Sequence, residues 1–321
     1  MKKIICNGSV LLVLASILMM SSCHKKQEKE TDTLKGTITI SGAFALYPMS
    51  VAWAEEFMKL HPQVKINISA GGAGKGMADA LTGLVDIGMF SREVKPEEEA
   101  KGAYWIAVTR DAVLPTINAK NPVLGDLMKK GLKKVDFEKI FLTNEVLTWG
   151  EVTGTENKDK IVVFTRSDAC GAAEMWGKYL GKDQESLKGT GVYGDPGIAD
   201  AVKNNINSIG YNNVVYVFDM QSRKKNDGIE VVPIDLNEDG KIDSTEYFYN
   251  TLDDIMNAIK SGVYPSPPAR DLFFVFNGKP QNPLVIEFVK WVLTEGQKMV
   301  EKAGYVALSE EKINASLKKL E

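Results

Sequence analysis

The sequence predicts an α/β fold in which the strands of a parallel sheet alternate with helices. The prediction starts from short stretches that have the alternating or β-branched pattern of strands. Each is followed by a glycine-rich or polar turn and then by apolar residues at helical spacing, an order of elements that favours a parallel sheet. The length of 321 residues is also sufficient for two domains with a large core.

The first part of the folded chain repeats this strand–turn–helix unit. Strands are expected at residues 37–40, 64–68 and 85–89, with helices at 46–60 and 77–84. The turns that follow the three strands are Ser41-Gly42, the glycine loop 71–76 and Phe90-Ser91-Arg92. Ligands of parallel sheets collect at the carboxyl ends of the strands, so these turns are candidates for a binding site.

The remaining elements complete the same type of fold. We expect a strand leaving the first lobe at 103–118, polar helices within 121–149, a helix at 195–205, a turn at 208–211, a strand at 214–218, a strand returning to the first lobe at 272–276, and a long amphipathic helix at 283–303. In the helix at 195–205, Asp195 is expected to be the cap and Pro196 the first helical residue.

Composition excludes several function classes. The chain is 44% hydrophobic and 25% charged with a net charge of −3, so it lacks the basic surplus of a nucleic-acid-binding protein. The only histidines are His24 and His61, which argues against a histidine-rich metal site or a Ser-His-Asp triad. The glycine loop does not have the G-x-x-x-x-G-K-[ST] spacing of a P-loop, which argues against a nucleotide site.

The first 35 residues are expected to lie outside the fold. Lys2 and Lys3 precede an apolar stretch that is too short to span a bilayer comfortably, and Met20-Ser21-Ser22-Cys23 resembles a bacterial lipobox. Residues 1–22 are therefore interpreted as a lipoprotein signal peptide, Cys23 as the lipidated residue, and 23–35 as a polar tether. An ordinary secretory signal is the alternative. Cys170 is then the only cysteine of the mature fold, which excludes an internal disulfide.

Residues 161–176, IVVFTRSDACGAAEMW, have the features of an anion site. A short strand leads through a polar turn to a helix start, where backbone N–H groups are free and the helix dipole is positive. Arg166 adds a planar guanidinium that can bind two oxygens, and Gly171 permits a ligand to approach the backbone. The alternative is an ordinary turn, with Asp168 as the helix cap and Arg166 exposed.

The turn Thr165-Arg166-Ser167-Asp168, with Gly171 after it, resembles the phosphate-contacting loop of the phosphate-binding solute receptors of Pst-type ABC transporters. Further motifs occur in the order of that family: 41–43, the glycine loop, 85–88, 91–92, 121–122, 194–197 and 209–211. The resemblance implies a periplasmic-binding-protein-like (type II) fold, with two lobes joined by two crossover strands. Its lobes are expected at 36–115 with 270–321, and at 116–269.

The same resemblance implies a function and a set of ligand-binding residues. The expected protein is a monomeric, lipid-anchored receptor of the cell envelope, on the periplasmic or extracytoplasmic side. It would capture inorganic phosphate or a similar oxyanion for an ABC permease in the cytoplasmic membrane. The implied anion-binding residues are Ala43, Phe44, Ala45, Ala73, Gly74, Ser91, Arg92, Arg166, Cys170, Gly171 and Ala172.

The chain departs from this family where hydroxyl groups usually bind phosphate. Phe44 stands where Ser or Thr is common, Ala73 where the glycine loop usually has Ser, and Cys170 and Ala172 where Ser and Thr are usual. A neutral hydrogen bond contributes only about 1 kcal/mol and a charged one about 1.5–3 kcal/mol, so Arg166 and the backbone could still hold an oxyanion. The departures bear on the identity of the anion more than on the fold.

Residues 235–246, DLNEDGKIDSTE, match the twelve-residue calcium loop at every position. Gly240 at position six permits the sharp turn, and Ile242 at position eight is the apolar anchor. The predicted ligands are Asp235, Asn237, Asp239, the carbonyl of Lys241, Asp243 and Glu246. The chain has no second loop of this kind, so a structural calcium ion is favoured over a sensing one.

Two other function classes remain open at this point. Cys170 at a helix start could be the nucleophile of a thiol-dependent enzyme, although no base is evident nearby in the sequence. A surface adhesin or signalling protein could also use the same fold without import. The receptor is the favoured function, and we expect no enzymatic activity.

Overall fold

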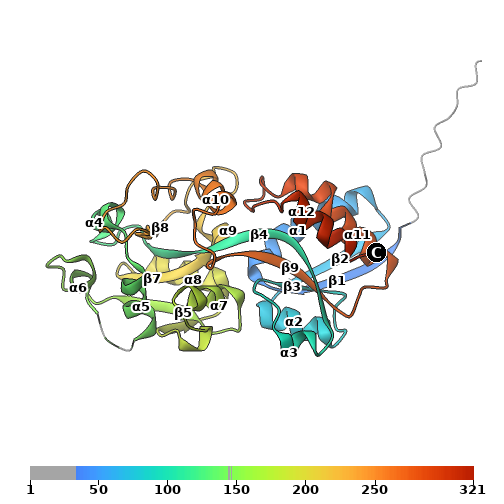
Figure 1. The fold of residues 1–321 in the computed structure, drawn as a ribbon, viewed down its shortest axis with the longest axis horizontal. Coiled ribbons are helices and arrows are strands. Elements are labelled where there is room, and N and C mark those ends of the chain that lie inside the picture. The colour runs from blue at the N-terminus through green and yellow to red at the C-terminus, as the bar shows by residue number, and fades with distance from the viewer. Residues whose placement is uncertain (1–33, 144, 146) are drawn as a thin grey trace, which may run out of the picture. The chain divides into compact units, whose positions relative to one another are not determined.

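The computed structural model describes residues 34–321 except residues 144 and 146 (Figure 1). The predicted signal peptide, the lipidated Cys23 and all but the last two residues of the predicted tether lie outside the described residues. Within the described part, no helix has the length and apolar character needed to cross a membrane.

The described strands form one mixed sheet, in the order β2-β1-β3-β9-β4-β7-β5-β6, with β8 paired to β4. Their bounds are β1 Gly36–Gly42, β2 Val64–Ala70, β3 Ile87–Phe90, β4 Ala103–Asn118, β5 Val162–Arg166, β6 Thr190–Val192, β7 Ser208–Asn213, β8 Ile229–Val231 and β9 Ala269–Asn277. Strands β1, β2 and β3 are parallel to one another, as are β5, β6 and β7. The crossover strands β4 and β9 are antiparallel to their neighbours, so the parallel arrangement holds within each lobe only.

The helices follow the strands in the predicted alternation (Figure 1). The α-helices are α1 Tyr47–Leu60, α2 Ala73–Leu81, α3 Pro96–Glu99, α4 Leu124–Lys130, α5 Lys134–Leu142, α6 Trp149–Thr153, α7 Gly171–Tyr179, α8 Gly194–Asn204, α9 Val214–Val217, α10 Leu252–Ser261, α11 Pro283–Leu293 and α12 Glu310–Lys318. Short 3-10 turns are η1 Phe44–Leu46, η2 Gln184–Ser186 and η3 Glu295–Met299.

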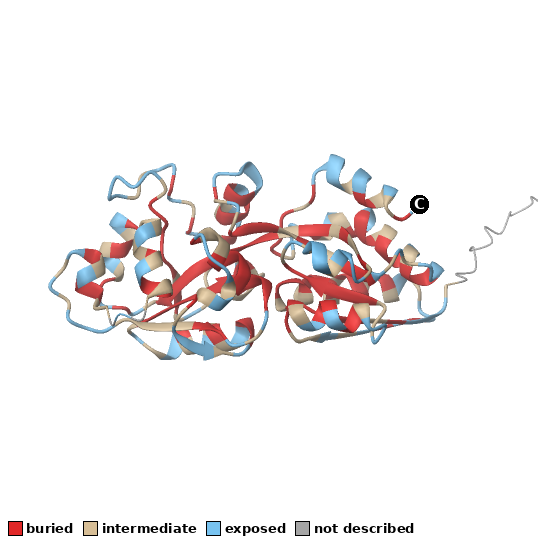
Figure 2. Cartoon of the chain, turned by 60° about the horizontal axis from the view of Figure 1, so that its bottom comes forward, coloured by how far each residue is buried: buried red, intermediate tan, exposed pale blue. Residues whose placement is uncertain are grey.

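Two separate hydrophobic cores define the two lobes, which confirms the predicted fold class. The buried strands run through the middle of each lobe, and the helices keep exposed outer faces (Figure 2). On β4, core membership changes between Val108 and Ala112, a few residues before the expected boundary at 115. On β9 it changes between Ala269 and Leu272, next to the expected boundary at 270.

Three local predictions were wrong. The expected helix at 283–303 ends at Leu293, because Thr294 leaves the helical conformation and Gly296 accepts a hydrogen bond from Trp53 Nε1 at 2.9 Å. The segment 208–218 differs from the expected turn and strand. Residues 208–211 belong to the strand β7, and residues 214–217 form the helical turn α9, whose Val214 and Val217 are both buried at helical spacing. The helix expected at 77–84 begins earlier, at Ala73 inside the glycine loop.

Candidate anion site

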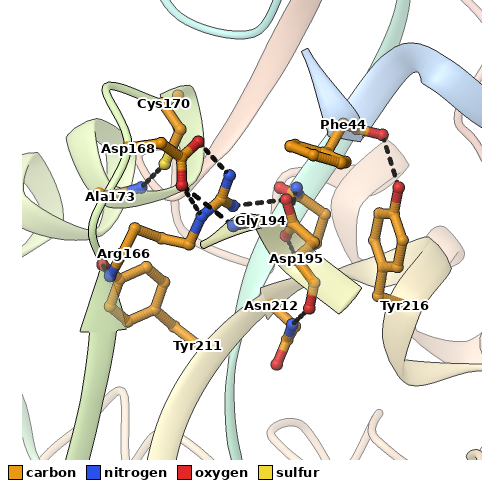
Figure 3. Close-up of polar contacts among 12 residues, drawn as sticks. Phe44, Arg166, Asp168, Cys170, Ala173, Gly194, Asp195, Tyr211, Asn212 and Tyr216 are labelled. Atoms are coloured by element: carbon orange, nitrogen blue, oxygen red, sulfur yellow. Dashed lines mark hydrogen bonds and ion pairs between the residues drawn. The ribbon is translucent and has the colours of Figure 1, made fainter. Parts of the chain in front are cut away.

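The candidate site lies at the carboxyl end of β5, where the chain turns into α7 (Figure 3). Arg166 is the last residue of β5, and its backbone N–H donates to Tyr211 Oη on the neighbouring β7 at 3.1 Å. The same Tyr211 hydroxyl lies 2.7 Å from Thr165 Oγ1. These contacts fix the end of the strand from which the Arg166 side chain starts.

Arg166 is clamped by two carboxylates. Its Nε and Nη2 donate to the two oxygens of Asp168 at 2.8 and 2.6 Å, and its Nη1 donates to Asp195 Oδ2 at 2.5 Å. Burial is the largest single effect and lowers the pKa of Arg166, but the charges and hydrogen bonds of its neighbours, Asp195 first and then Asp168, together outweigh it, so the pKa is raised and the guanidinium stays charged. A guanidinium has five N–H groups, so two remain for a ligand. The side chain is only 1% exposed, so its neighbours enclose the guanidinium almost completely.

Asp195 is not the helix cap that the sequence predicts. Helix α8 begins at Gly194, and the Asp195 carboxylate is buried, where Oδ1 accepts from Asn213 N at 3.2 Å and from Asn213 Nδ2 at 2.7 Å. The prediction was wrong because a helix-start pattern cannot show a cation 29 residues earlier in the chain. Asp168 is not a helix cap either: its Oδ1 accepts from Gly194 N at 3.1 Å.

The start of α7 combines four of the predicted residues. Cys170 is the N-cap, and its Sγ accepts from Ala173 N at 3.4 Å. Gly171 and Ala172 open the helix, where backbone N–H groups have no partner within the helix. Gly171 packs so closely on Ser91 that a Cβ would overlap the Ser91 carbonyl, so Ser91 at the end of β3 meets the helix start of the other lobe. The structure thus brings Ser91, Cys170, Gly171 and Ala172 together.

Phe44 covers the guanidinium instead of offering a hydroxyl. The centre of its ring lies 5.5 Å from Arg166 Cζ, and both side chains are seen in Figure 3. The Phe44 ring also meets the Tyr193 ring edge-on, with 5.8 Å between the ring centres. Its carbonyl accepts from Tyr216 Oη at 3.0 Å. This cation–π contact gives Arg166 an apolar cover on one side.

Several other predicted residues have their backbone groups engaged elsewhere. Ala43 N donates to Met89 O at 2.9 Å, so the N–H group predicted to bind an anion is already used. The Ala45 carbonyl accepts from Tyr305 Oη at 2.8 Å, and the residue is buried. Gly74 N donates to Ala169 O at 3.1 Å, so the glycine loop joins the two lobes at this point. Ala73, the first residue of α2, is buried beside it.

Arg92 points to partners outside the site. It forms a bidentate ion pair with Glu98, at 2.9 and 2.7 Å, and stacks 4.5 Å from the centre of the Phe90 ring. Proximity in sequence to Ser91 made it a candidate, but α3 supplies a carboxylate only six residues later. The structure therefore favours Arg166 as the arginine that would meet a ligand.

The sequence reasoning did not detect a second buried arginine. Arg270 on β9 pairs with Asp111 on β4, with Nε to Oδ1 at 2.9 Å, and its Nη1 donates to the Gly171 carbonyl at 2.6 Å. Both side chains are buried, and the two residues face each other across the paired crossover strands. The only available signal was the position of Arg270 just before the predicted returning strand. Arg270 links the crossover strands to the start of α7.

Cys170 does not have the environment of a nucleophile. The thiol is buried, and burial raises the pKa of Cys170 to about 12. A reactive cysteine needs a lowered pKa and access to solvent. The thiol-dependent enzyme considered from the sequence therefore has no support at this position.

The predicted calcium loop lies apart from Arg166, between β8 and α10 of the second lobe. Asp235 and Glu246 are buried, whereas Asn237 and Asp239 are exposed. Within the described residues, no three His, Cys, Asp or Glu side chains are gathered as a ready-made metal cluster.

Two lobes with separate cores, joined by paired crossover strands and meeting at a buried arginine, define the class of two-lobe solute-binding proteins. The model of the PBP superfamily domain matches residues 27–295. The chain belongs to this superfamily.

Two individual relatives and one solved structure are also solute-binding proteins. The chain is 28% identical to the phosphate-binding protein PstS of Pseudomonas aeruginosa over 313 residues, which cover 89% of this chain and 88% of the relative. It is 27% identical to PstS of Staphylococcus haemolyticus over 295 residues, which cover 89% and 86%. A crystal structure from Clostridium perfringens, described as a phosphate ABC transporter substrate-binding protein with bound phosphate, has a TM-score of 0.70 and 25% identity. The alignment covers 85% of this chain and 100% of that chain. The predicted resemblance to Pst-type receptors is confirmed, and these relatives are binding proteins rather than enzymes.

Proposed function

We propose that this protein is an extracytoplasmic receptor that binds phosphate or a related oxyanion between its two lobes and delivers it to an ABC permease. The names of its relatives support the ligand class and the transport role. One observation in the chain itself carries the proposal: Arg166 is charged, buried and held rigidly, with two N–H groups left over, at a strand end that leads into the start of α7.

The proposed ligand contacts are Arg166 and the N–H groups of Gly171 and Ala172, with the hydroxyl of Ser91 beside them. An oxyanion there would gain charge-assisted bonds from a preorganised donor set and the positive end of the α7 dipole. Asp168 and Asp195 outnumber the single guanidinium, so the formal charge of the three groups is −1. The two carboxylates orient Arg166, and the attraction for an anion comes from the directed N–H groups. The missing hydroxyls at Ala73, Cys170 and Ala172 make backbone donors more important here.

Calorimetry on the purified protein tests the proposal. We expect heat of binding and a melting shift with at least one of phosphate, phosphonates, sulfate, molybdate and arsenate. The order of affinities identifies the anion, since these ligands differ in charge and in the protons they can donate. The absence of heat and of any melting shift with all five would refute the oxyanion receptor.

We further propose that the receptor is monomeric and is held at the membrane by lipid on Cys23. The lipobox-like sequence before Cys23 supports the anchor. In cell fractionation, the unmodified chain should stay with the membranes and the Cys23→Ala variant should not be lipidated. Equal, lipid-free recovery of both chains in the soluble fraction would contradict the anchor. Size-exclusion chromatography with light scattering measures the number of subunits.

A further inference from the structure

The loop 235–246 contains a buried carboxylate oxygen that has no hydrogen-bond donor. Asp235 is 2% exposed, and its Oδ2 accepts from Gly240 N at 2.8 Å. Its Oδ1 is buried and has no partner. Because the sister oxygen bonds to Gly240, the carboxylate is directed into the loop. A buried acceptor without a donor destabilises the fold, and a bound ion or water is the usual explanation for such an oxygen.

Oxygen atoms of hard-ligand type surround this position in the chain. Asn237 Oδ1, Asp239 Oδ1 and Asp243 Oδ1 each accept from the backbone N–H two residues later, at 2.9, 3.1 and 2.7 Å. These bonds direct the side chains along the loop. The Oδ1 atoms of Asn237 and Asp239 each keep a second lone pair, whereas Asp243 Oδ1 also accepts from Thr245 Oγ1 at 2.7 Å. Gly240 has φ 84, the left-handed conformation that the sixth position of a calcium loop requires.

Glu246 ties the end of the loop to its beginning. The side chain is buried, and its Oε1 accepts from Leu236 N at 2.6 Å and from Asn237 N at 3.1 Å. The twelfth residue therefore already lies over the first three positions. The described residues hold no ready-made cluster of three such side chains, so an ion would have to draw the carboxylates of the loop together.

Positive charges near the loop do not neutralise Asp235. Lys133 Nζ donates to the Glu238 carbonyl at 2.5 Å, and Lys241 Nζ lies 3.8 Å from Asp239 Oδ2 at the surface. A cavity of about 110 Å³ is lined by Asp235 and Gly240, with Lys130 and Lys133 on its wall. Of the predicted calcium ligands, only Asp235 lines this cavity, so it gives access to one side of the Asp235 carboxylate.

We propose that this loop binds one calcium ion through Asp235, Asn237, Asp239, the Lys241 carbonyl, Asp243 and Glu246. Carboxylate, amide and carbonyl oxygens at alternate positions suit calcium, which accepts six to eight oxygen ligands in flexible geometry. The ion supplies the missing partner of Asp235 Oδ1. It links the chain that follows β8 to the chain that leads into α10, and it is independent of the anion site.

The experiment titrates the full-length chain, purified in mild detergent and freed of metal, with calcium chloride and then magnesium chloride in a calorimeter. We expect one calcium per chain, weaker binding of magnesium, and a melting temperature that rises by several degrees with calcium. The absence of heat together with identical melting curves in chelator and in millimolar calcium would overturn the proposal.

A matched pair of variants separates a built site from diffuse attraction to an acidic loop. Glu246→Gln and Glu238→Gln remove the same charge from the same loop, but only Glu246 is a proposed ligand. We expect Glu246→Gln to weaken calcium by at least about tenfold and Glu238→Gln to leave it nearly unchanged. Equal weakening in both would overturn the site.

Two further measurements complete the test. If circular dichroism shows that Glu246→Gln is unfolded, Asp235→Asn replaces it in the same comparison. If both variants are unfolded, the calcium titration of the unmodified chain decides the proposal. Anion affinity measured with and without calcium should be the same. A large loss of anion affinity on chelation would contradict the independence of the two sites.

Discussion

At the scale of single residues, Arg166 determines what the candidate site can bind. Its three bonds to Asp168 and Asp195 hold the guanidinium in one orientation. We expect Arg166→Ala to weaken oxyanion binding by more than about 1.5 kcal/mol, because a charge-assisted bond to the ligand is lost. Arg166→Lys keeps the charge but loses the planar arrangement of N–H donors. Its affinity for the oxyanion should therefore lie between that of the unmodified chain and that of Arg166→Ala. Calorimetry measures both.

The control for this prediction is Arg92→Ala. Arg92 also forms a bidentate pair with a carboxylate, Glu98, but its partners lie outside the site. Oxyanion affinity should not change in this variant. Equal losses in the two alanine variants would show that the site extends to Arg92, and an unchanged affinity in Arg166→Ala would assign Arg166 a purely structural role. Melting curves must accompany both, because Asp168 and Asp195 lose their cation in Arg166→Ala.

Cys170 leads to a prediction about pH. An ordinary free cysteine has a pKa of about 8.5, so the rate of its reaction with a thiol reagent rises steeply from pH 7 to 9. Burial raises the pKa of Cys170 to about 12, so the thiol stays protonated over this range and its labelling should stay slow in the folded protein. The measurement uses a Cys6→Ser, Cys23→Ser chain, with the unfolded chain as the positive control.

A companion variant, Cys170→Ser, tests the role of the side chain. Serine is a good N-cap and can accept from Ala173 N as the sulfur does, so stability and oxyanion binding should persist. Fast labelling of native Cys170 near neutral pH would contradict the buried, protonated thiol. Loss of binding in Cys170→Ser without loss of stability would show that sulfur contributes to the ligand site.

At the scale of elements, the crossover strands are joined by the buried pair Asp111 and Arg270. Arg270→Met leaves Asp111 buried without its cation, and we expect a loss of about 3–5 kcal/mol in the free energy of unfolding. The double variant Asp111→Leu, Arg270→Met should be less destabilised than Arg270→Met alone, because no uncompensated charge remains. Denaturant unfolding measures all three chains.

A partly exposed ion pair between β9 and α12 is the control. Lys312 pairs with Asp271, the neighbour of Arg270, but both side chains are partly exposed. Lys312→Met should change the free energy of unfolding by no more than about 1 kcal/mol. If Arg270→Met is as mild as Lys312→Met, the buried pair does not hold the crossover strands together.

At the scale of the whole molecule, the candidate site takes residues from both lobes. Ser91 packs on Gly171, and Gly74 N donates to Ala169 O, so a bound oxyanion should hold the two lobes together. A ligand that binds only the folded state adds about 2.7 kcal/mol at 100 times its dissociation constant. With the oxyanion bound, hydrogen exchange of the backbone amides should therefore slow at the start of α2 and at the start of α7 together. Protection confined to one lobe would contradict a site between them.

Local sequence patterns were sufficient to place most elements and the candidate site along the chain. Strand alternation, glycine turns and helical spacing are local signals, and they located β1, α1, β2, β3, β5 and α7. The motif around Arg166 was recognised for the same reason, since Arg166, Asp168 and Gly171 lie within six residues of one another. The calcium-loop pattern is also contiguous, so its candidate ligands could be named from the order of the residues alone.

Which charges meet depends on the folded chain and not on local patterns. Asp195 pairs with Arg166, which is 29 residues away in the sequence, and Arg270 pairs with Asp111, which is 159 residues away. A helix-cap or strand pattern cannot indicate such distant partners. The sequence also did not indicate the ion pair of Arg92 with Glu98, or the contact of Trp53 with Gly296 just beyond the end of α11 at Leu293. Burial makes these pairings decisive: a charge removed from water must find its opposite charge, and only the tertiary structure shows where that charge lies.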